Sequence, residues 1–204
     1  MNRRFILSAS NRRLILAGGI AVAIVAGTTV AVRPWFSQPP DAMTAAEIGG
    51  PFALVGADGR TVTEADFHGK WMLVYFGYTQ CPDACPTALN SIANALDMLK
   101  ARRASVAPIF ISVDPARDTP AVMGHYVALF DKQIVGLTGT QAQIDRVTRE
   151  YRVYAARHPT KDGGYTMDHS SIIYVMDPQG RFNSVIDGAA NPEDIAAKIA
   201  KLES

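Results

Sequence analysis

The sequence predicts an α/β fold in which a mixed β-sheet is flanked by helices and preceded by a transmembrane helix. Three observations lead to this prediction. Short apolar runs alternate with segments of helical periodicity, and the chain closes with a hairpin and a helix. Two cysteines, four positions apart, stand where an apolar strand gives way to a helix, an arrangement that is thioredoxin-like in this element order. A stretch without charge lies near the N-terminus.

The uncharged stretch covers residues 14–32, which are 19 residues. As a helix it would be about 28 Å long, against a hydrocarbon core of ~30 Å, so it can span a bilayer. Residues 1–13 contain four arginines and are therefore expected in the cytoplasm. We expect a single-pass anchor in the inner (cytoplasmic) membrane, with the C-terminal part on the periplasmic, extracytoplasmic side. A cleaved signal peptide is the alternative.

A linker over 33–41 would join the anchor to one domain over 42–204, which is long enough to have its own core. The chain has 20 basic and 19 acidic residues, and no run rich in Lys or Arg lies outside the anchor flank. This balance gives no reason to expect a nucleic acid as a partner.

The elements of the domain follow from turn, capping and periodicity signals. Asp58-Gly59 suits a tight hairpin turn, Thr119-Pro120 and Asn191-Pro192 suit helix starts, and Thr140 with Gln143 forms a capping box. In chain order we expect strands at 52–55, 60–63 and 71–76, a helix from the cysteine motif to about residue 102, a strand at 106–113, a helix at 120–130, a strand at 134–137, a helix to about residue 150, strands at 171–176 and 181–186, and a last helix from 192.

Cys81 and Cys85 are the only cysteines of the chain. At the start of a helix, backbone N–H groups and the helix dipole favour thiolate over thiol, so we expect reactive sulfurs at this position. Thiolates bind metals or exchange disulfides. Both kinds of chemistry remain open on the cysteine spacing alone.

Four segments resemble the Sco/SenC family: residues 75–86, 114–120, 136–140 and 165–171, the last containing Asp168-His169-Ser170. The resemblance implies a membrane-anchored thioredoxin-like domain that binds copper, as Cu(I) or Cu(II), and assists assembly of the binuclear copper centre of cytochrome c oxidase. By that resemblance Cys81, Cys85 and His169 are the copper ligands. The sequence departs locally from the family at Gln80, where relatives often carry a histidine or an aromatic residue.

The chemistry of these residues is compatible with copper. Two soft thiolates and one imidazole suit Cu(I), which accepts low coordination numbers, whereas structural zinc would need a fourth ligand. A ligand histidine usually has its second nitrogen held by a carboxylate or carbonyl, so Asp168 is a candidate for that role beside His169. A turn or partner-surface carboxylate is the other interpretation of Asp168. The remaining histidines, 68, 125 and 158, cannot be placed near the thiols from sequence.

The family resemblance and the cysteine pair lead to two hypotheses for the function. The first is a metallochaperone rather than an enzyme, which receives copper from a donor protein and passes it to the copper-bearing subunit of cytochrome c oxidase. The second is a thiol-disulfide oxidoreductase or redox sensor that uses a Cys81–Cys85 disulfide on acceptor cysteines. The second function needs both cysteines but not His169.

Overall fold

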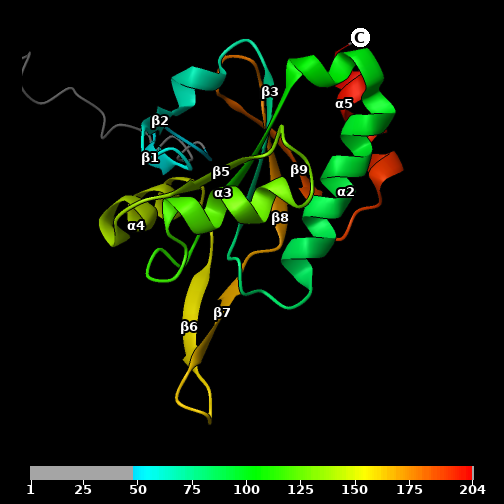
Figure 1. The fold of residues 1–204 in the computed structure, drawn as a ribbon. Coiled ribbons are helices and arrows are strands. Elements are labelled where there is room, and N and C mark those ends of the chain that lie inside the picture. Colours follow the sequence, from blue (N-terminus) through cyan, green and yellow to red (C-terminus); the bar gives the residue numbers. More distant parts are fainter. Residues whose placement is uncertain (1–47, 204) are drawn as a thin grey trace, which may run out of the picture. The chain divides into compact units, whose positions relative to one another are not determined.

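The computed structural model describes residues 48–203 (Figure 1). The expected anchor at 14–32 and the linker at 33–41 lie outside the described residues. Within residues 48–203, no helix is both long and apolar enough to cross a membrane.

The main sheet is seven-stranded and mixed, with the order β2-β1-β5-β4-β3-β8-β9. Its strands are β1 (Ala53–Gly56), β2 (Thr61–Thr63), β3 (Trp71–Gly77), β4 (Val106–Ser112), β5 (Val135–Thr138), β8 (Ile172–Met176) and β9 (Phe182–Asp187). The neighbours β3, β4 and β5 are parallel, while β1, β8 and β9 pair antiparallel with their neighbours. The strands lie within a residue or two of the expected positions.

Strands β3 and β4 form the buried centre of the sheet. Every residue of β4, and every residue of β3 after Trp71, is buried. Central parallel strands are covered on both faces, which explains their continuous apolar sequences. The parallel register pairs Gly77 with Ser112, so the carboxyl ends of both strands meet at one edge of the sheet. The loop with the first cysteine and the loop before the next helix both start at this edge.

Helices cover both faces of the sheet. They are α2 (Ala84–Leu99), α3 (Pro120–Ala128), α4 (Gln141–Glu150) and α5 (Pro192–Leu202), with the short 3-10 helices η1 (Glu64–Phe67) and η2 (Lys100–Ser105). Phe110 of β4 contacts Tyr126 of α3, whereas Phe76 of β3 points to the opposite face and contacts Tyr151 at the end of α4. The α2 and α5 helices pack against each other (Figure 1). The predicted thioredoxin-like mixed sheet flanked by helices is confirmed.

Two helices end earlier than the sequence predicts. The α2 helix stops at Leu99, because Lys100 adopts a φ of 53° and the chain continues as η2. The α3 helix stops at Ala128, two residues before the expected end. Neither difference affects the start of α2, where Cys85 lies.

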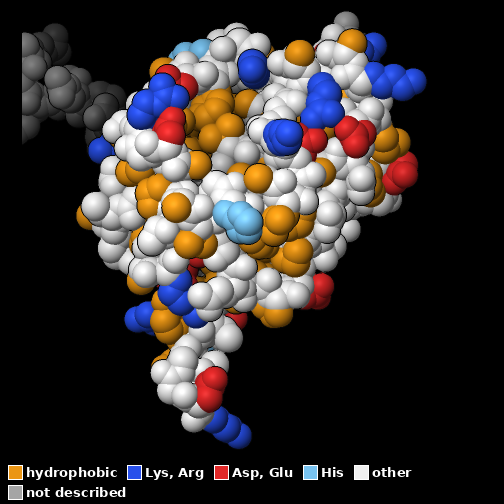
Figure 2. Space-filling model, in the orientation of Figure 1, with side chains coloured by type: hydrophobic (Ala, Val, Ile, Leu, Met, Phe, Trp, Pro, Cys, Tyr) orange, Lys and Arg blue, Asp and Glu red, His pale blue; other side chains and the backbone are white. Residues whose placement is uncertain are grey.

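A second, two-stranded sheet was not predicted. It consists of β6 (Ala155–Pro159) and β7 (Tyr165–His169), which form a hairpin that projects from the rest of the domain (Figure 1). His158, which the sequence could not place near the thiols, lies in β6. Figure 2 shows charged side chains on the projecting hairpin. The last residue of β7 is His169, so the predicted histidine ligand lies where the hairpin joins the main sheet at β8.

Candidate metal centre

The two cysteines lie at the junction of β3 and α2. Cys81 is partly exposed in the connecting loop, whereas Cys85 is fully buried in the first turn of the helix. The Cys85 N–H donates to the Cys81 Sγ at 3.4 Å, and the two sulfurs are not bonded to each other. Gly77 leaves room for this arrangement, because a Cβ there would lie 2.5 Å from the Cys85 Sγ and 2.8 Å from a ring carbon of Phe110.

His169 faces the cysteines from the end of β7. Its Nε2 lies 3.3 Å from the Cys85 Sγ, and its Nδ1 lies 3.2 Å from the carbonyl oxygen of Ser170. A carbonyl can only accept, so this contact requires the proton on Nδ1 and leaves the Nε2 lone pair directed at the sulfur. The rings of Tyr75 and Tyr78 contact the imidazole edge-on, at centroid distances of 6.1 and 5.9 Å. These contacts fix the plane of the ring.

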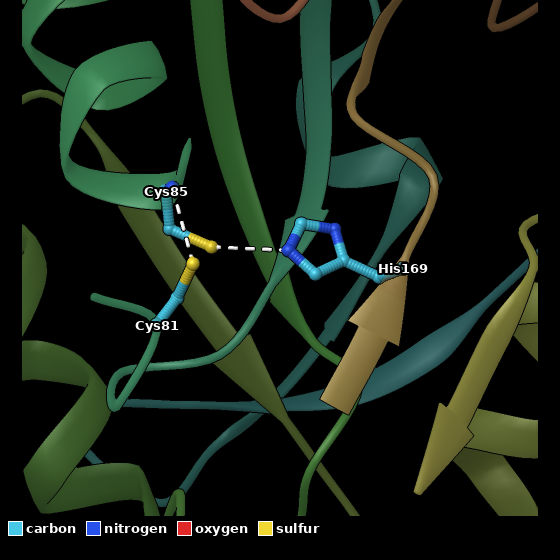
Figure 3. A group of neighbouring side chains, drawn as sticks. All are labelled: Cys81, Cys85 and His169. Carbon is cyan, nitrogen blue, oxygen red and sulfur yellow. Dashed lines mark hydrogen bonds between the residues drawn. The ribbon is translucent and has the colours of Figure 1, made fainter. Parts of the chain in front are cut away.

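The three predicted ligand residues therefore converge (Figure 3). One ligand atom each from Cys81, Cys85 and His169 lies within 4.8 Å of the others, and among residues 48–203 no other His, Cys, Asp or Glu joins this group. The set contains two sulfurs and one neutral imidazole nitrogen, which suits a soft ion of low coordination number. The donor set therefore fits Cu(I) better than structural zinc.

Asp168 does not hold the second nitrogen of His169, the role for which it was a candidate. Its carboxylate is mostly exposed and lies 3.0 Å from the Nε2 of His158, on the neighbouring strand β6. The carbonyl of Ser170, not the carboxylate of Asp168, holds the second nitrogen of His169. Successive side chains of a strand point to opposite faces, which is why Asp168 turns away when His169 turns inward.

Burial sets the protonation states of Cys85 and His169 when no metal is bound. Desolvation raises the pKa of the Cys85 thiol well above its ordinary value, so the expectation that the helix start favours thiolate is wrong for this residue. Desolvation also lowers the pKa of His169, which favours the neutral imidazole. At neutral pH the metal-free centre thus pairs a Cys85 thiol with an uncharged Nε2 acceptor.

A buried carboxylate, Asp118, holds the loop before Cys81. Asp118 is 1% exposed and accepts from the Thr79 N–H at 3.2 Å, the Thr79 hydroxyl at 2.7 Å and the Ser112 hydroxyl at 2.6 Å. These bonds tie the cysteine loop to the end of β4. The segment 114–120 carries part of the family resemblance and a helix start, but no role was predicted for Asp118. The position of this segment, directly after a buried strand that ends beside the cysteine loop, could have indicated that its carboxylates lie near the site.

The profile of the SCO1/SenC family matches residues 40–204. The chain belongs to this family. Among curated relatives it is similar to the protein SenC of Rhodobacter capsulatus, with 39% identity over 201 residues that cover 95% of this chain and 91% of the relative. The family assignment thus agrees with the resemblance found in the sequence.

Solved Sco structures resemble the described domain. Bradyrhizobium japonicum ScoI with copper bound is 49% identical, with a TM-score of 0.71 over 76% of this chain and 98% of the other. Yeast Sco1 with copper bound is 36% identical, with a TM-score of 0.71 over 78% of this chain and 90% of the other. Both similar structures thus come from Sco proteins that hold copper.

Proposed function

We propose that this Sco/SenC protein is a metallochaperone that binds copper and delivers it for assembly of the binuclear copper centre of cytochrome c oxidase. The proposal depends on one observation above all, the convergence of Cys81, Cys85 and His169 within 4.8 Å. Copper is the cargo, and the ligands are the two sulfurs and the Nε2 of His169. The copper-bound relatives and the implied role of the family support this assignment.

The site is built for ligand exchange as well as for binding. Cys81 is partly exposed while Cys85 is buried, so an incoming thiolate can approach the ion beside Cys81. His169 comes from a different element than the cysteines, so an acceptor ligand could take its place on the ion without disturbing α2. An acceptor subunit would thus take over the ion one ligand at a time, after a donor protein has loaded it.

Metal analysis of the reduced full-length protein tests the binding step. We expect one copper per chain, and strong thiolate-to-copper charge-transfer absorption when Cu(II) is added. Cys81→Ala, Cys85→Ala and His169→Ala should each weaken binding. Full binding by His169→Ala would remove this residue from the ligand set.

Thiol-disulfide exchange by Cys81 and Cys85 is the competing function, because the two sulfurs belong to one group and one of them is accessible. Cells limited for copper separate the two functions. Under copper delivery, loss of any of the three residues should reduce cytochrome oxidase assembly, and added copper should restore part of it. Under the competing function, His169→Ala would retain activity, and a chemical reductant rather than copper would rescue the cysteine variants.

We also propose that residues 14–32 anchor the protein in the cytoplasmic membrane, with the copper domain on the extracytoplasmic side. Tethering would keep the domain close to a membrane-bound acceptor. Reporter fusions at the C-terminus should be active only outside the cytoplasm, and activity inside it would reverse the topology. Removal of residues 1–40 should leave a soluble, folded domain, since the described core begins at Phe52.

A further inference from the structure

The position of His169 depends on how the β6–β7 hairpin is attached, because within residues 48–203 this hairpin pairs with no strand of the main sheet. Side chains alternate along β7. Tyr165, Met167 and His169 are partly buried, while Thr166 and Asp168 are exposed. The three inward side chains lie on one face of the strand. A contact that holds Tyr165 therefore also restricts the orientation of β7 and the position of His169 relative to the cysteines.

Arg117, in the loop between β4 and α3, makes this contact. Its Nη1 donates to the backbone oxygen of Tyr165 at 3.0 Å, and its Cζ lies 3.7 Å from the centre of the Tyr165 ring. The Tyr165 hydroxyl donates to Asp114 at 2.8 Å, and Asp114 also accepts from the Arg117 Nε. Asp114 is 4% exposed, so this cluster belongs to the rigid edge of the main sheet.

The same guanidinium reaches the cysteine loop. The Arg117 Nη1 also donates to the side-chain oxygen of Gln80 at 3.0 Å, and Gln80 directly precedes Cys81. A second contact runs through Tyr78, whose ring lies 5.8 Å from the Arg117 Cζ and also contacts the imidazole of His169. One side chain thus joins the strand of the histidine to the loop of the cysteines.

We propose that Arg117 is a positioning residue that holds His169 against the cysteine pair by clamping Tyr165 to the cysteine loop. As far as it concerns copper, this inference rests on the proposed function. The clamp uses three directions of a planar guanidinium at once: Nε toward Asp114, Nη1 toward Gln80 and Tyr165, and the flat face on the ring. A lysine keeps the charge but cannot reproduce this geometry.

Two variants separate positioning from other roles of Arg117. Arg117→Lys keeps the positive charge near the thiols, so it should behave like Arg117→Gln if geometry matters and like wild type if only charge matters. Arg157 provides a matched control. It is exposed, comes from β6 within the hairpin, and lies 3.4 Å from the centre of the same Tyr165 ring. Arg157→Gln should leave His169 in place.

The experiment measures Cu(I) affinity of the reduced full chain in mild detergent, in a double-mutant cycle of Arg117→Gln with His169→Ala. We expect Arg117→Gln to weaken binding roughly 10- to 100-fold, as is typical for residues that orient a ligand, and to have no further effect when His169 is absent. Equal weakening in both backgrounds, no weakening, or wild-type affinity in Arg117→Lys would overturn the positioning role.

Nuclear magnetic resonance of the metal-free chain gives a readout that does not involve copper. In wild type we expect the Nδ1–H form of His169 and a proximity signal between its ring and Cys85, and we expect both to be lost in Arg117→Gln and retained in Arg157→Gln. Retention of both in Arg117→Gln would overturn the inference. If wild type bound no copper but Arg117→Gln still released His169, the proposed function would fail while the clamp would stand.

Tyr165→Ala distinguishes loss of the clamp from a folding defect in the Arg117 variants. The residue lies on the hairpin, outside the main sheet, so its removal should leave the thermal unfolding of the domain nearly unchanged. It should nevertheless reproduce the loss of affinity and of the His169–Cys85 proximity. A folded Tyr165→Ala protein with wild-type affinity and proximity would show that the clamp does not position His169.

Discussion

The carboxyl end of the central strands and the β6–β7 hairpin supply the same site in different ways. The cysteines follow β3, whose residues after Trp71 are all buried, and Cys85 itself has no exposed surface. His169 ends a hairpin whose first strand is exposed at four of its five positions. A buried strand has many packing contacts that fix its end, whereas an exposed hairpin depends on a few attachments.

This difference assigns different tasks to the ligands. The cysteines form a fixed pair on the main sheet, and the histidine completes the site from an element held by fewer contacts. Such a division suits a protein that must hold an ion and also release it. It also predicts that the loss of a cysteine ligand lowers copper affinity more than the loss of the histidine or of a contact that holds the hairpin.

The largest expected effect is the loss of a cysteine. Structural zinc sites bind with apparent free energies of ~10–16 kcal/mol for about four ligands, so one ligand is worth roughly 3 kcal/mol. We therefore expect Cys85→Ala to weaken Cu(I) binding by more than about a hundredfold. His169→Ala should lose less, because both thiolates remain. Competition with a Cu(I) chelator gives the ranking, and an equal or larger loss in His169→Ala would contradict the division of tasks.

The next largest effect concerns packing behind the cysteines. In Gly77→Ala, the added Cβ would lie 2.5 Å from the Cys85 Sγ and 2.8 Å from Phe110, so the sulfur or the ring must move. We expect a loss of about 1–3 kcal/mol in the free energy of unfolding together with weaker copper binding. Gly163→Ala, at the hairpin tip, is the control: its φ of 85° makes the substitution unfavourable, but no non-neighbouring atom of residues 48–203 lies within 4 Å of the new Cβ. This control should leave copper affinity unchanged, and a similar loss of affinity in both variants would argue against a special role of Gly77.

The same contrast explains what the sequence could predict. The main sheet and its helices follow from long apolar runs, Pro at helix starts and the Thr140 capping box, which are local signals. The β6–β7 hairpin lacks such signals, since β6 contains Arg157, His158 and Pro159 and has no apolar alternation. Only Asp162-Gly163, a dipeptide that favours tight turns, indicated a hairpin.

The site shows a similar limit. The resemblance named all three converging residues, but burial of Cys85 and the hydrogen bond of His169 depend on tertiary structure. The cysteine position suggested a thiolate at a helix start, whereas desolvation raises the pKa of Cys85, a side chain with no exposed surface. The roles of Asp118 and Arg117 arise from contacts between separate loops, which no local pattern encodes.

A third prediction concerns pH. Because burial raises the pKa of Cys85, its thiol is protonated at neutral pH, and Cu(I) must displace that proton. Affinity should fall about tenfold for each pH unit of acidification per proton released. His169 has a lowered pKa and stays neutral, so it adds proton competition only in more acidic solution. Calorimetry in buffers of different ionisation enthalpy measures the release, and binding near pH 7 without released protons would contradict the buried thiol.

The smallest effect is expected for Asp168→Asn, on the outer face of the hairpin. Asp168 contacts His158 at an exposed position, where even a charged pair contributes only about 0–1 kcal/mol, and the charge of Asp168 raises the pKa of His169. The substitution should lower that pKa a little and leave the bond from Nδ1 to the Ser170 carbonyl in place, so Cu(I) affinity should change by only a few-fold. Ser170 acts through its backbone, which side-chain substitution retains, and this makes Asp168 the informative position. A loss of affinity as large as that of His169→Ala would mean that the carboxylate, and not the carbonyl, orients the histidine when copper is bound.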